Sequence, residues 1–345
     1  MNTTNKKELP GNQTGADLEK HGKFVISLDF ELLYGMNDKS KLERWQRTAA
    51  GAREVIPKML SLFQQYQMHV TWGIVGMLYA HNKEEWKENV PLRIPQYEDK
   101  RFSNYEQMED LGENEIEDAL HFAPSLIRQI EATEYQEIAS HTFSHYYCME
   151  KGQTKKDFMA DIKKSIEVAG RTGKEVKSLI FPKNQFQNAY MDILADQGIL
   201  AVRGNESGFM YQASEAGESL LKRGVRLLDS FWNLSGYHDY ALDKLEILSG
   251  VVNIPSSRLF RPYSHKLRIL ERFKLNRIKG QMRHAAKHGR VFHLWWHPHN
   301  FGGNQVENLA NLQSILDYYK LLQQRYGMQS ASMQEIAEER LQKCI

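Results

Sequence analysis

Two histidines near the middle of the chain have the spacing of metal ligands. In Ser140-His141-Thr142-Phe143-Ser144-His145 the imidazoles lie four positions apart, at a predicted strand-to-helix junction. Side chains at this spacing can face one point, as the ligands of a metal ion must. A single pair of this kind is more often a surface or packing feature, so the interpretation requires further ligands elsewhere in the sequence.

Two carboxylates are candidates for the further ligand and for a general base. Asp29 and Glu31 follow the β-prone run Phe24-Val25-Ile26-Ser27-Leu28, and residues two apart on an extended segment point to the same side. Two carboxylates in one pocket repel each other unless a cation lies between them. Two histidines and one carboxylate would hold a divalent ion and leave a position for water, which is typical of a catalytic site. Taken singly, Asp29 would be a cap or turn residue and Glu31 a solvated charge.

A third group of polar residues lies near the end of the chain. The segment His293-Leu294-Trp295-Trp296-His297-Pro298-His299 places three imidazoles about one predicted strand end, where alternation puts the odd-numbered residues on one side. His297 follows the apolar run and precedes the proline that ends the strand, so we predict that it donates a proton to the leaving group, with His299 in reserve. The pair Trp295-Trp296 is interpreted as core in preference to a sugar-binding platform.

Strands and helices alternate along the chain and would position these groups. The predicted strands are Phe24–Leu28, His69–Val75, Glu137–Ala139, Leu179–Phe181, Leu200–Val202, Gly250–Ile254 and Val291–Trp295. The predicted helices between them are Thr48–Gln67, Ile116–Glu131, Lys155–Thr172 and Tyr190–Gln197. Such alternation predicts an α/β fold with a parallel sheet or barrel, in which functional residues lie at the C-terminal ends of strands.

Length and composition indicate one large domain. The chain has 345 residues, and we expect a polar, disordered tail over 1–20, a catalytic domain over 21–345 and an insertion over about 79–112. No stretch approaches the length of a membrane-spanning helix. The tail lacks the apolar section of a secretory signal, and Cys148 and Cys344 lie far apart, so we predict a cytoplasmic protein without a disulfide framework.

The three groups together resemble the polysaccharide deacetylases of the NodB-homology type, a carbohydrate esterase family. The matching blocks are Ser27-Leu28-Asp29-Phe30-Glu31, His141-Thr142-Phe143-Ser144-His145 and Leu294-Trp295-Trp296-His297. The resemblance implies a deformed (β/α)7 barrel of the glycoside hydrolase and deacetylase type. It also implies a divalent metal, usually zinc, and hydrolysis of an N-acetyl group on an amino sugar. Carried over by position, Asp29 is the base, His141 and His145 bind metal, and His297 is the acid.

Two positions depart from the family pattern. The family usually has two adjacent aspartates, the second binding metal, whereas Phe30 stands here and Glu31 must serve as the metal ligand. The family's third block carries an arginine that pairs with the base, and none aligns within Ile180-Phe181-Pro182-Lys183-Asn184-Gln185. Lys183, or Arg203 at the next strand end, is expected to take over that role.

A basic segment covers about 257–290, with eleven arginines and lysines and Glu271 as the only acid. We favour a solvated helix face over a site for an anionic partner, such as a phosphate-linked glycan precursor or a membrane surface. Nucleic acid is not an expected partner, because the net charge is only +2.

The sequence thus predicts a metal-dependent hydrolase that removes an N-acyl group from an amino sugar in a glycan or in a lipid-linked precursor, within surface polysaccharide synthesis. One alternative is an amidohydrolase acting on a small cyclic amide or imide. The other is a non-catalytic glycan-binding protein on the same fold, which the missing arginine and Phe30 would favour.

Overall fold

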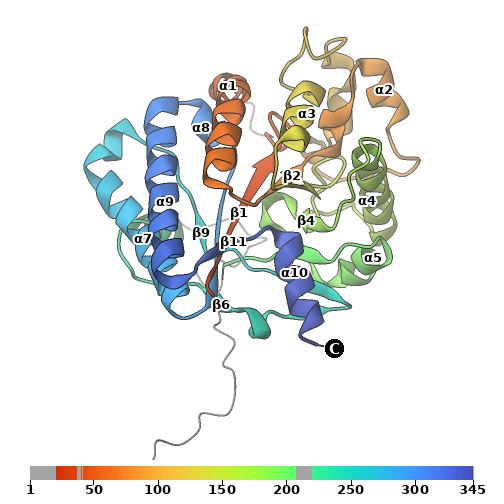
Figure 1. Ribbon diagram of the computed structural model, residues 1–345. Helices are drawn as coiled ribbons and strands as arrows, with labels where there is room; N and C mark the ends of the chain where they lie inside the picture. Colours follow the sequence, from red (N-terminus) through yellow and green to blue (C-terminus); the bar gives the residue numbers. More distant parts are fainter. Residues whose placement is uncertain (1–20, 37–39, 41, 207–219, 345) are drawn as a thin grey trace, which may run out of the picture.

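The computed structural model describes residues 21–36, 40, 42–206 and 220–344 (Figure 1). The tail predicted to be disordered, 1–20, lies outside the described residues. Within the described ranges, no helix combines the length and apolarity needed to cross a membrane.

Parallel strands form the centre of the molecule. In spatial order they are β10 (Arg290–Trp296), β1 (Lys23–Phe30), β2 (Val70–Ile74), β3 (Gln136–Ser140), β4 (Ser178–Ile180), β5 (Ala201–Arg203) and β8 (Val251–Asn253). Almost every strand residue is buried, because helices cover the strands on the outside and side chains fill the interior. This double burial explains why the strands appear in the sequence as short continuous apolar runs.

A single extended segment closes the sheet into a barrel. Val252 of β8 pairs with Ala201 of β5, and a few residues later β9 (Arg258–Leu259) pairs with β10. Between them, the Ser257 amide donates to the His293 carbonyl at 2.8 Å. The segment that contains β8 and β9 therefore takes the place of the seventh parallel strand and closes the barrel. The prediction of a deformed (β/α)7 barrel is confirmed.

Short strands extend the barrel at its edges. These are β6 (Tyr240–Ala241) and β7 (Ile247–Leu248), both antiparallel to their neighbours, and β11 (Gln329–Ser330), parallel to β1.

Helices surround the strands (Figure 1). They are α1 (Leu42–Tyr66), α3 (Pro124–Ala132), α4 (Lys155–Gly170), α5 (Met191–Asp196), α6 (Leu220–Asp229), α7 (Glu271–Lys287), α8 (His299–Gly302), α9 (Gln305–Tyr326) and α10 (Met333–Gln342).

The helix predicted from Ile116 was placed too early, since α3 begins at Pro124. Asp118 accepts hydrogen bonds from the amides of Gly112 and Leu120, and such local bonds compete with helix formation.

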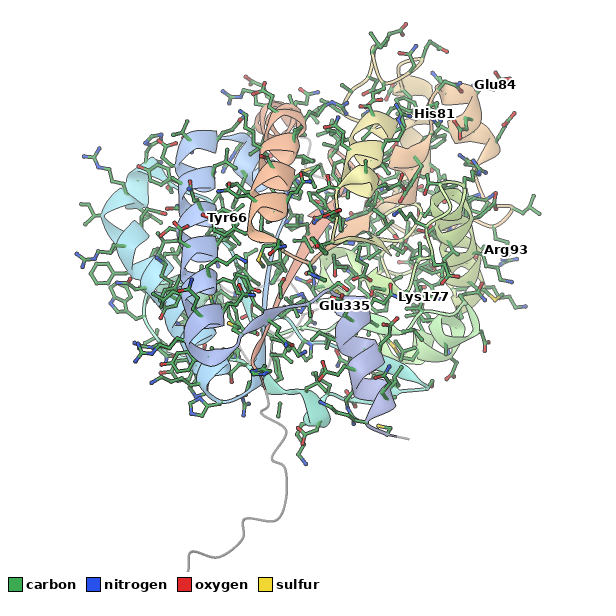
Figure 2. All side chains as sticks on the ribbon, in the orientation of Figure 1. Tyr66, His81, Glu84, Arg93, Lys177 and Glu335 are labelled. Carbon is green, nitrogen blue, oxygen red and sulfur yellow. The ribbon has the colours of Figure 1, made fainter. Side chains whose placement is uncertain are left out.

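The segment between β2 and α3 covers one side of the barrel's C-terminal end. It contains η2 (Gly76–Tyr79), α2 (Lys83–Glu88), η3 (Lys100–Phe102) and η4 (Asn104–Asp110). Trp86 anchors it, because this indole is buried and donates to the Tyr34 hydroxyl at 3.0 Å. Charged side chains such as those of Glu84 and Arg93 project from its outer surface (Figure 2).

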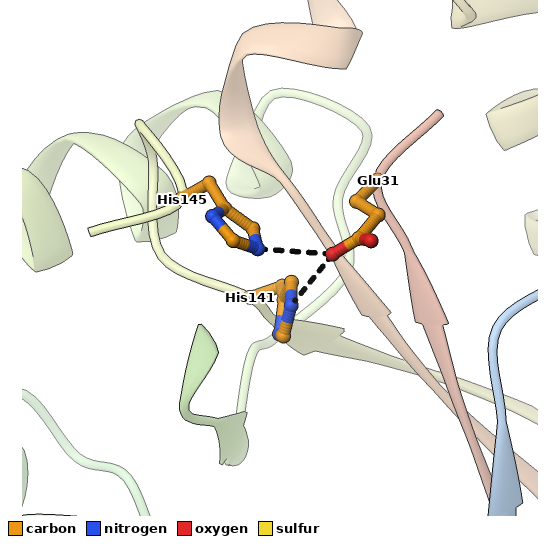
Figure 3. A group of neighbouring side chains, drawn as sticks. All are labelled: Glu31, His141 and His145. Carbon is orange, nitrogen blue, oxygen red and sulfur yellow. Dashed lines mark hydrogen bonds and ion pairs between the residues drawn. The ribbon is translucent and has the colours of Figure 1, made fainter. Parts of the chain in front are cut away.

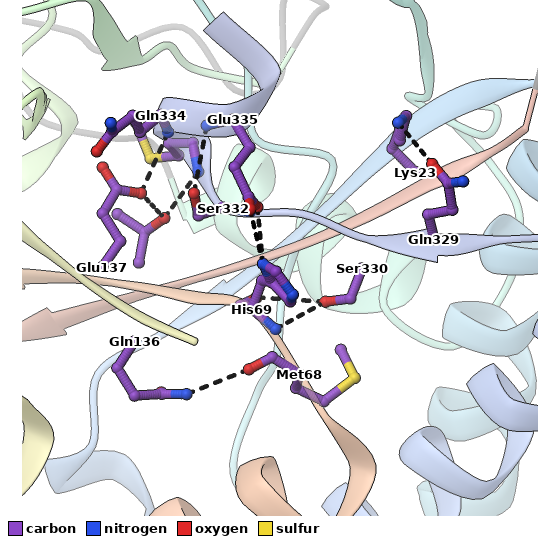
Figure 4. Close-up of polar contacts among 12 residues, drawn as sticks. Lys23, Met68, His69, Gln136, Glu137, Gln329, Ser330, Ser332, Gln334 and Glu335 are labelled. Atoms are coloured by element: carbon purple, nitrogen blue, oxygen red, sulfur yellow. Dashed lines mark hydrogen bonds and ion pairs between the residues drawn. The ribbon is translucent and has the colours of Figure 1, made fainter. Parts of the chain in front are cut away.

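Polar contacts close the opposite, N-terminal end of the barrel (Figure 4). The Thr71 hydroxyl donates to Glu137 at 2.6 Å and accepts from the Met333 amide at 2.9 Å. His69 lies 2.8 Å from Glu335 on α10. Because α10 is fixed over this end, the C-terminal ends of the strands are left for a functional site.

The basic segment is only partly a solvated face. Lys274 and Arg277 of α7 are buried, and the Lys274 ammonium donates to the Arg261 carbonyl at 2.9 Å. Arg258 is also buried and pairs with Asp229 at 2.7 Å. The interpretation as a wholly solvated face is wrong for these residues, whose charges are satisfied within the protein.

Candidate active site

The end of β1 brings two carboxylates into the barrel mouth. Asp29 belongs to β1 and Glu31 follows the strand directly, and both are buried, at 3% and 7% exposure. Phe30 between them points the other way and packs edge-on against Trp72, with ring centroids 6.4 Å apart. The alternation of an extended chain therefore places Asp29 and Glu31 on one side.

The two histidines lie on a loop and not on a helix. β3 ends at Ser140 and α4 begins only at Lys155, so helical spacing does not bring the rings together. Instead, His145 and Thr142 adopt left-handed backbone conformations, with φ of 55° and 63°. Such conformations are uncommon outside glycine and occur often at functional sites.

Asp161 of α4 holds this loop in place, a role that sequence reasoning missed. Its buried carboxylate accepts hydrogen bonds from the amides of Phe143 and Ser144 at 2.6 and 3.1 Å, and from the Ser144 hydroxyl. Burial raises the pKa of Asp161 to about 6, although these donors oppose the shift. Nothing in the sequence distinguishes Asp161 from the other charged residues of an amphipathic helix.

Glu31, His141 and His145 face one point (Figure 3). The Glu31 Oε2 lies 2.9 Å from His145 Nε2 and 3.5 Å from His141 Nε2, and one ligand atom from each residue lies within 4.8 Å of the others. His141 Nδ1 lies 2.9 Å from the Ile180 carbonyl, to which it donates, so Nε2 keeps its lone pair. That nitrogen is buried without a hydrogen-bond partner.

These observations fit a divalent metal ion. Two imidazole nitrogens and one carboxylate oxygen are the ligands that zinc accepts in catalytic sites. Burial lowers the pKa of His145, although Glu31 opposes the shift, and the neutral imidazole is the form that binds metal. The histidines and the carboxylate closest to them are those predicted from the sequence.

Arg203 clamps Asp29 from the end of β5. Its two terminal nitrogens lie 2.5 and 2.7 Å from the two oxygens of Asp29, a bidentate pair whose members are both buried. The guanidinium also donates to Ser27 and stacks on the Trp295 ring at 4.3 Å. Burial opposes ionisation of Asp29, but Arg203 and the nearby His297 outweigh it and keep its pKa below the usual value. Lys183 and Arg203 were the two expected substitutes for the family arginine, and Arg203 is the one that contacts Asp29.

The end of β10 supplies the late histidines. His297 Nε2 lies 3.7 Å from Asp29 and 3.6 Å from Glu31, and its side chain is 25% exposed. His299, the reserve, starts α8 with its Nδ1 4.0 Å from Glu31, and burial lowers its pKa to about 3. His293 is buried deeper in the barrel, 2.8 Å from the Ser27 hydroxyl.

The tryptophan pair is part of the packed structure. Trp296 is fully buried, and Trp295 is 8% exposed beneath the Arg203 guanidinium. Trp295 therefore supports the arginine that orients Asp29.

A cavity of about 800 Å³ opens over these groups. Its lining includes Glu31, His297, His299, Trp45, Arg101 and Lys183. Arg101 belongs to η3 and Lys183 to η5 (Pro182–Asn184), so elements far apart in the sequence complete the site.

Comparison with known proteins agrees with this geometry. Residues 48–202 match the model of the polysaccharide deacetylase family, a range that includes His141 and His145 but ends before Arg203. No curated protein matches the sequence.

Solved structures share the fold at low sequence identity. A protein of Mycobacterium smegmatis assigned as a polysaccharide deacetylase has 14% identity and a TM-score of 0.61, covering 98% of this chain and 96% of its own. A second protein with that assignment, from Pseudomonas aeruginosa PAO1, has 11% identity and a TM-score of 0.55, with coverage of 93% and 91%. The Puue allantoinase has 12% identity and a TM-score of 0.53, with 97% of both chains covered.

Over residues 48–202 the chain is similar to the polysaccharide deacetylase family, whose members are hydrolases of carbon–nitrogen bonds other than peptide bonds. The solved structures show that the whole chain shares the fold of proteins assigned as polysaccharide deacetylases.

Proposed function

We propose that this protein is a metal-dependent deacylase that removes an N-acyl group from an amino sugar in a glycan or glycan precursor. The acyl group that we propose first is N-acetyl. The observation that carries the proposal is the juxtaposition of two groups. Glu31, His141 and His145 face one point, and next to them Arg203 clamps Asp29. One group has the ligands of a metal and the other has a carboxylate held for proton transfer.

The residues divide the proposed reaction between them. A divalent ion held by Glu31, His141 and His145 would activate water and polarise the amide carbonyl. Asp29 would accept the proton of the attacking water, because its lowered pKa keeps it ionised at neutral pH. His297 faces the same space from β10 and would donate a proton to the departing amine. The products are the free amine and acetate.

Metal analysis tests the first half of the proposal. Purified protein is expected to contain one equivalent of zinc or another divalent ion, and the double variant His141→Ala, His145→Ala is expected to lose it. His81→Ala, an exposed histidine at the edge of α2, is the matched control and should retain the metal. An equal metal content in the double variant and the control would refute the metal site.

Acetate release from N-acetylated sugars tests the second half. Asp29→Asn should bind metal normally but lose turnover by a factor of about 10²–10⁴, the usual contribution of a general base. Asp196→Asn, a change of the same type at an exposed residue at the end of α5 and outside the cavity lining, should keep its turnover. Substantial activity in Asp29→Asn would rule out the role of this carboxylate.

A cyclic amide is the second candidate substrate, supported by the fold shared with the Puue allantoinase. Hydrolysis of a cyclic amide opens a ring without releasing acetate, so product analysis separates the two. A non-catalytic role has less support, because Arg203 contacts Asp29 and Glu31 faces the two histidines, as the roles carried over from the family require.

A further inference from the structure

Lys183 stands at the cavity with its ammonium held between two aromatic rings. Its Nζ lies 4.5 Å from the ring centre of Tyr147 and 4.9 Å from that of Phe102. Phe102 belongs to the segment between β2 and α3, and Tyr147 follows the metal-site loop. Cation–π contacts with two separate elements fix the position of this charge relative to Glu31.

The backbone of Lys183 is also unusual. It adopts a left-handed conformation, with φ of 50° and ψ of 24°, and Asn184 after it has φ of 53°. Left-handed conformations are unfavourable for residues with a Cβ atom, and they persist where the surrounding structure imposes them, often at functional sites. Here the conformation directs a charged side chain to the cavity that holds Glu31 and His297.

Among the residues that line the cavity, the two cations Arg101 and Lys183 outnumber the one carboxylate, Glu31. Asp29 is neutralised by Arg203, and Glu31 is surrounded by histidines and would be neutralised further by a metal. Arg101, which also lines the cavity, shares its charge with Asp99. Glu150, Glu31 and Asp99 attract Lys183 from a distance, but among the described residues no carboxylate forms an ion pair with its ammonium.

We propose that Lys183 binds an anionic group of the substrate, so that the preferred substrate is an N-acylated amino sugar that carries a phosphate or a carboxylate. This inference rests on the proposed function and adds to it the charge class of the substrate. An ammonium is a compact charge that phosphates and carboxylates bind directly, and the partial desolvation between two rings strengthens the contact. A neutral sugar would leave this charge without a counter-ion.

Ligand binding to the metal-loaded protein, with every variant also carrying Asp29→Asn so that the probes are not hydrolysed, tests the proposal without depending on turnover. Titration calorimetry would compare three probes: N-acetylglucosamine, N-acetylglucosamine 1-phosphate and N-acetylmuramic acid. At least one anionic probe should bind about tenfold more tightly than the neutral one, with the stronger of the two identifying phosphate or carboxylate as the source. Lys183→Met should reduce this preference towards unity, and Lys183→Arg should retain much of it.

Lys156→Met on the outer face of α4 is the control, because Lys156 is exposed and lies outside the cavity lining. It should keep the preference of the unchanged protein. Equal affinities for all three probes, or an undiminished anion preference in Lys183→Met, would overturn the proposal. Acetate release, measured in parallel, decides the proposed deacylase activity separately. Methionine and arginine both keep the Cβ atom of lysine, so Lys183→Met and Lys183→Arg carry the same backbone strain at position 183.

Discussion

Asp29 and Arg203 show how a single pair of residues prepares a buried carboxylate for chemistry. A carboxylate removed from water would favour its protonated form, but the bidentate guanidinium keeps it ionised and fixes its plane. Trp295 beneath the guanidinium limits its movement. In the proposed reaction Arg203 acts through Asp29 and is therefore a positioning residue.

Replacement of Arg203 should affect turnover more than substrate affinity. Arg203→Met leaves Asp29 buried without its partner, so we expect kcat to fall by about 10²-fold or more while metal content is retained. Arg203→Lys restores the charge but not the two-point contact, and should recover part of the loss. Steady-state kinetics together with metal analysis check both variants.

Arg93→Met is the control for Arg203, since Arg93 also pairs with an aspartate, Asp157, but lies on the outer surface (Figure 2). It should leave kcat and KM unchanged. A loss confined to KM in Arg203→Met would contradict the positioning role.

At the scale of elements, the turn after β1 has to leave room for the metal-site loop. Gly35 has φ of 95°, and a Cβ atom built on it would lie 2.6 Å from the His145 ring. Gly173 has a similar φ of 80°, but a Cβ there meets nothing within 4 Å. Both glycines thus have a positive φ, but only at Gly35 would an added Cβ atom contact a proposed metal ligand, His145.

The pair makes a matched experiment. Both Gly35→Ala and Gly173→Ala should lose about 1 kcal/mol of stability from the positive φ. Only Gly35→Ala should also displace His145, which we expect to weaken metal affinity by about 10- to 100-fold, as changes next to metal ligands do. Thermal unfolding and metal titration measure the two effects. Equal metal affinities in the two variants would show that the His145 ring has space to move.

The sequence allowed the strands and the main site residues to be predicted, because apolar runs that end in Asp29, His141 and His297 identify strand ends in a barrel. It could not predict how the loop of His145 folds. That depends on left-handed backbone at His145 and on the carboxylate of Asp161, which is distant in the sequence. Arg203 was one of two candidates, and the choice follows from the three-dimensional position of its guanidinium, which contacts Asp29 from the end of β5.

At the scale of the whole molecule, closure of the barrel buries charge. The segment that joins β8 to β9 carries Arg258 into the interior, where it meets Asp229, and Glu206 after β5 is buried near both. Among the described residues, the Glu206 Oε2 has no hydrogen-bond partner. Burial and the charge of Asp229 raise the pKa of Glu206 to about 7, against the opposing effect of Arg258.

This shift predicts how stability depends on pH. Between about pH 4.5 and pH 7 the unfolded chain loses the proton of Glu206 while the folded protein retains it, so the free energy of unfolding falls as the pH rises. The contribution of Glu206 to the free energy of unfolding is about 3 kcal/mol, present in full below pH 4.5 and lost above pH 7.

Glu206→Gln stays neutral at every pH and should not show this decline. Urea unfolding at several pH values from 5 to 8 should therefore give a smaller decrease for Glu206→Gln than for the unchanged protein. Glu175→Gln, whose side chain is 80% exposed, should follow the unchanged protein. The same decline in all three proteins would mean that Glu206 is already ionised in the folded barrel, with Arg258 outweighing the cost of burial.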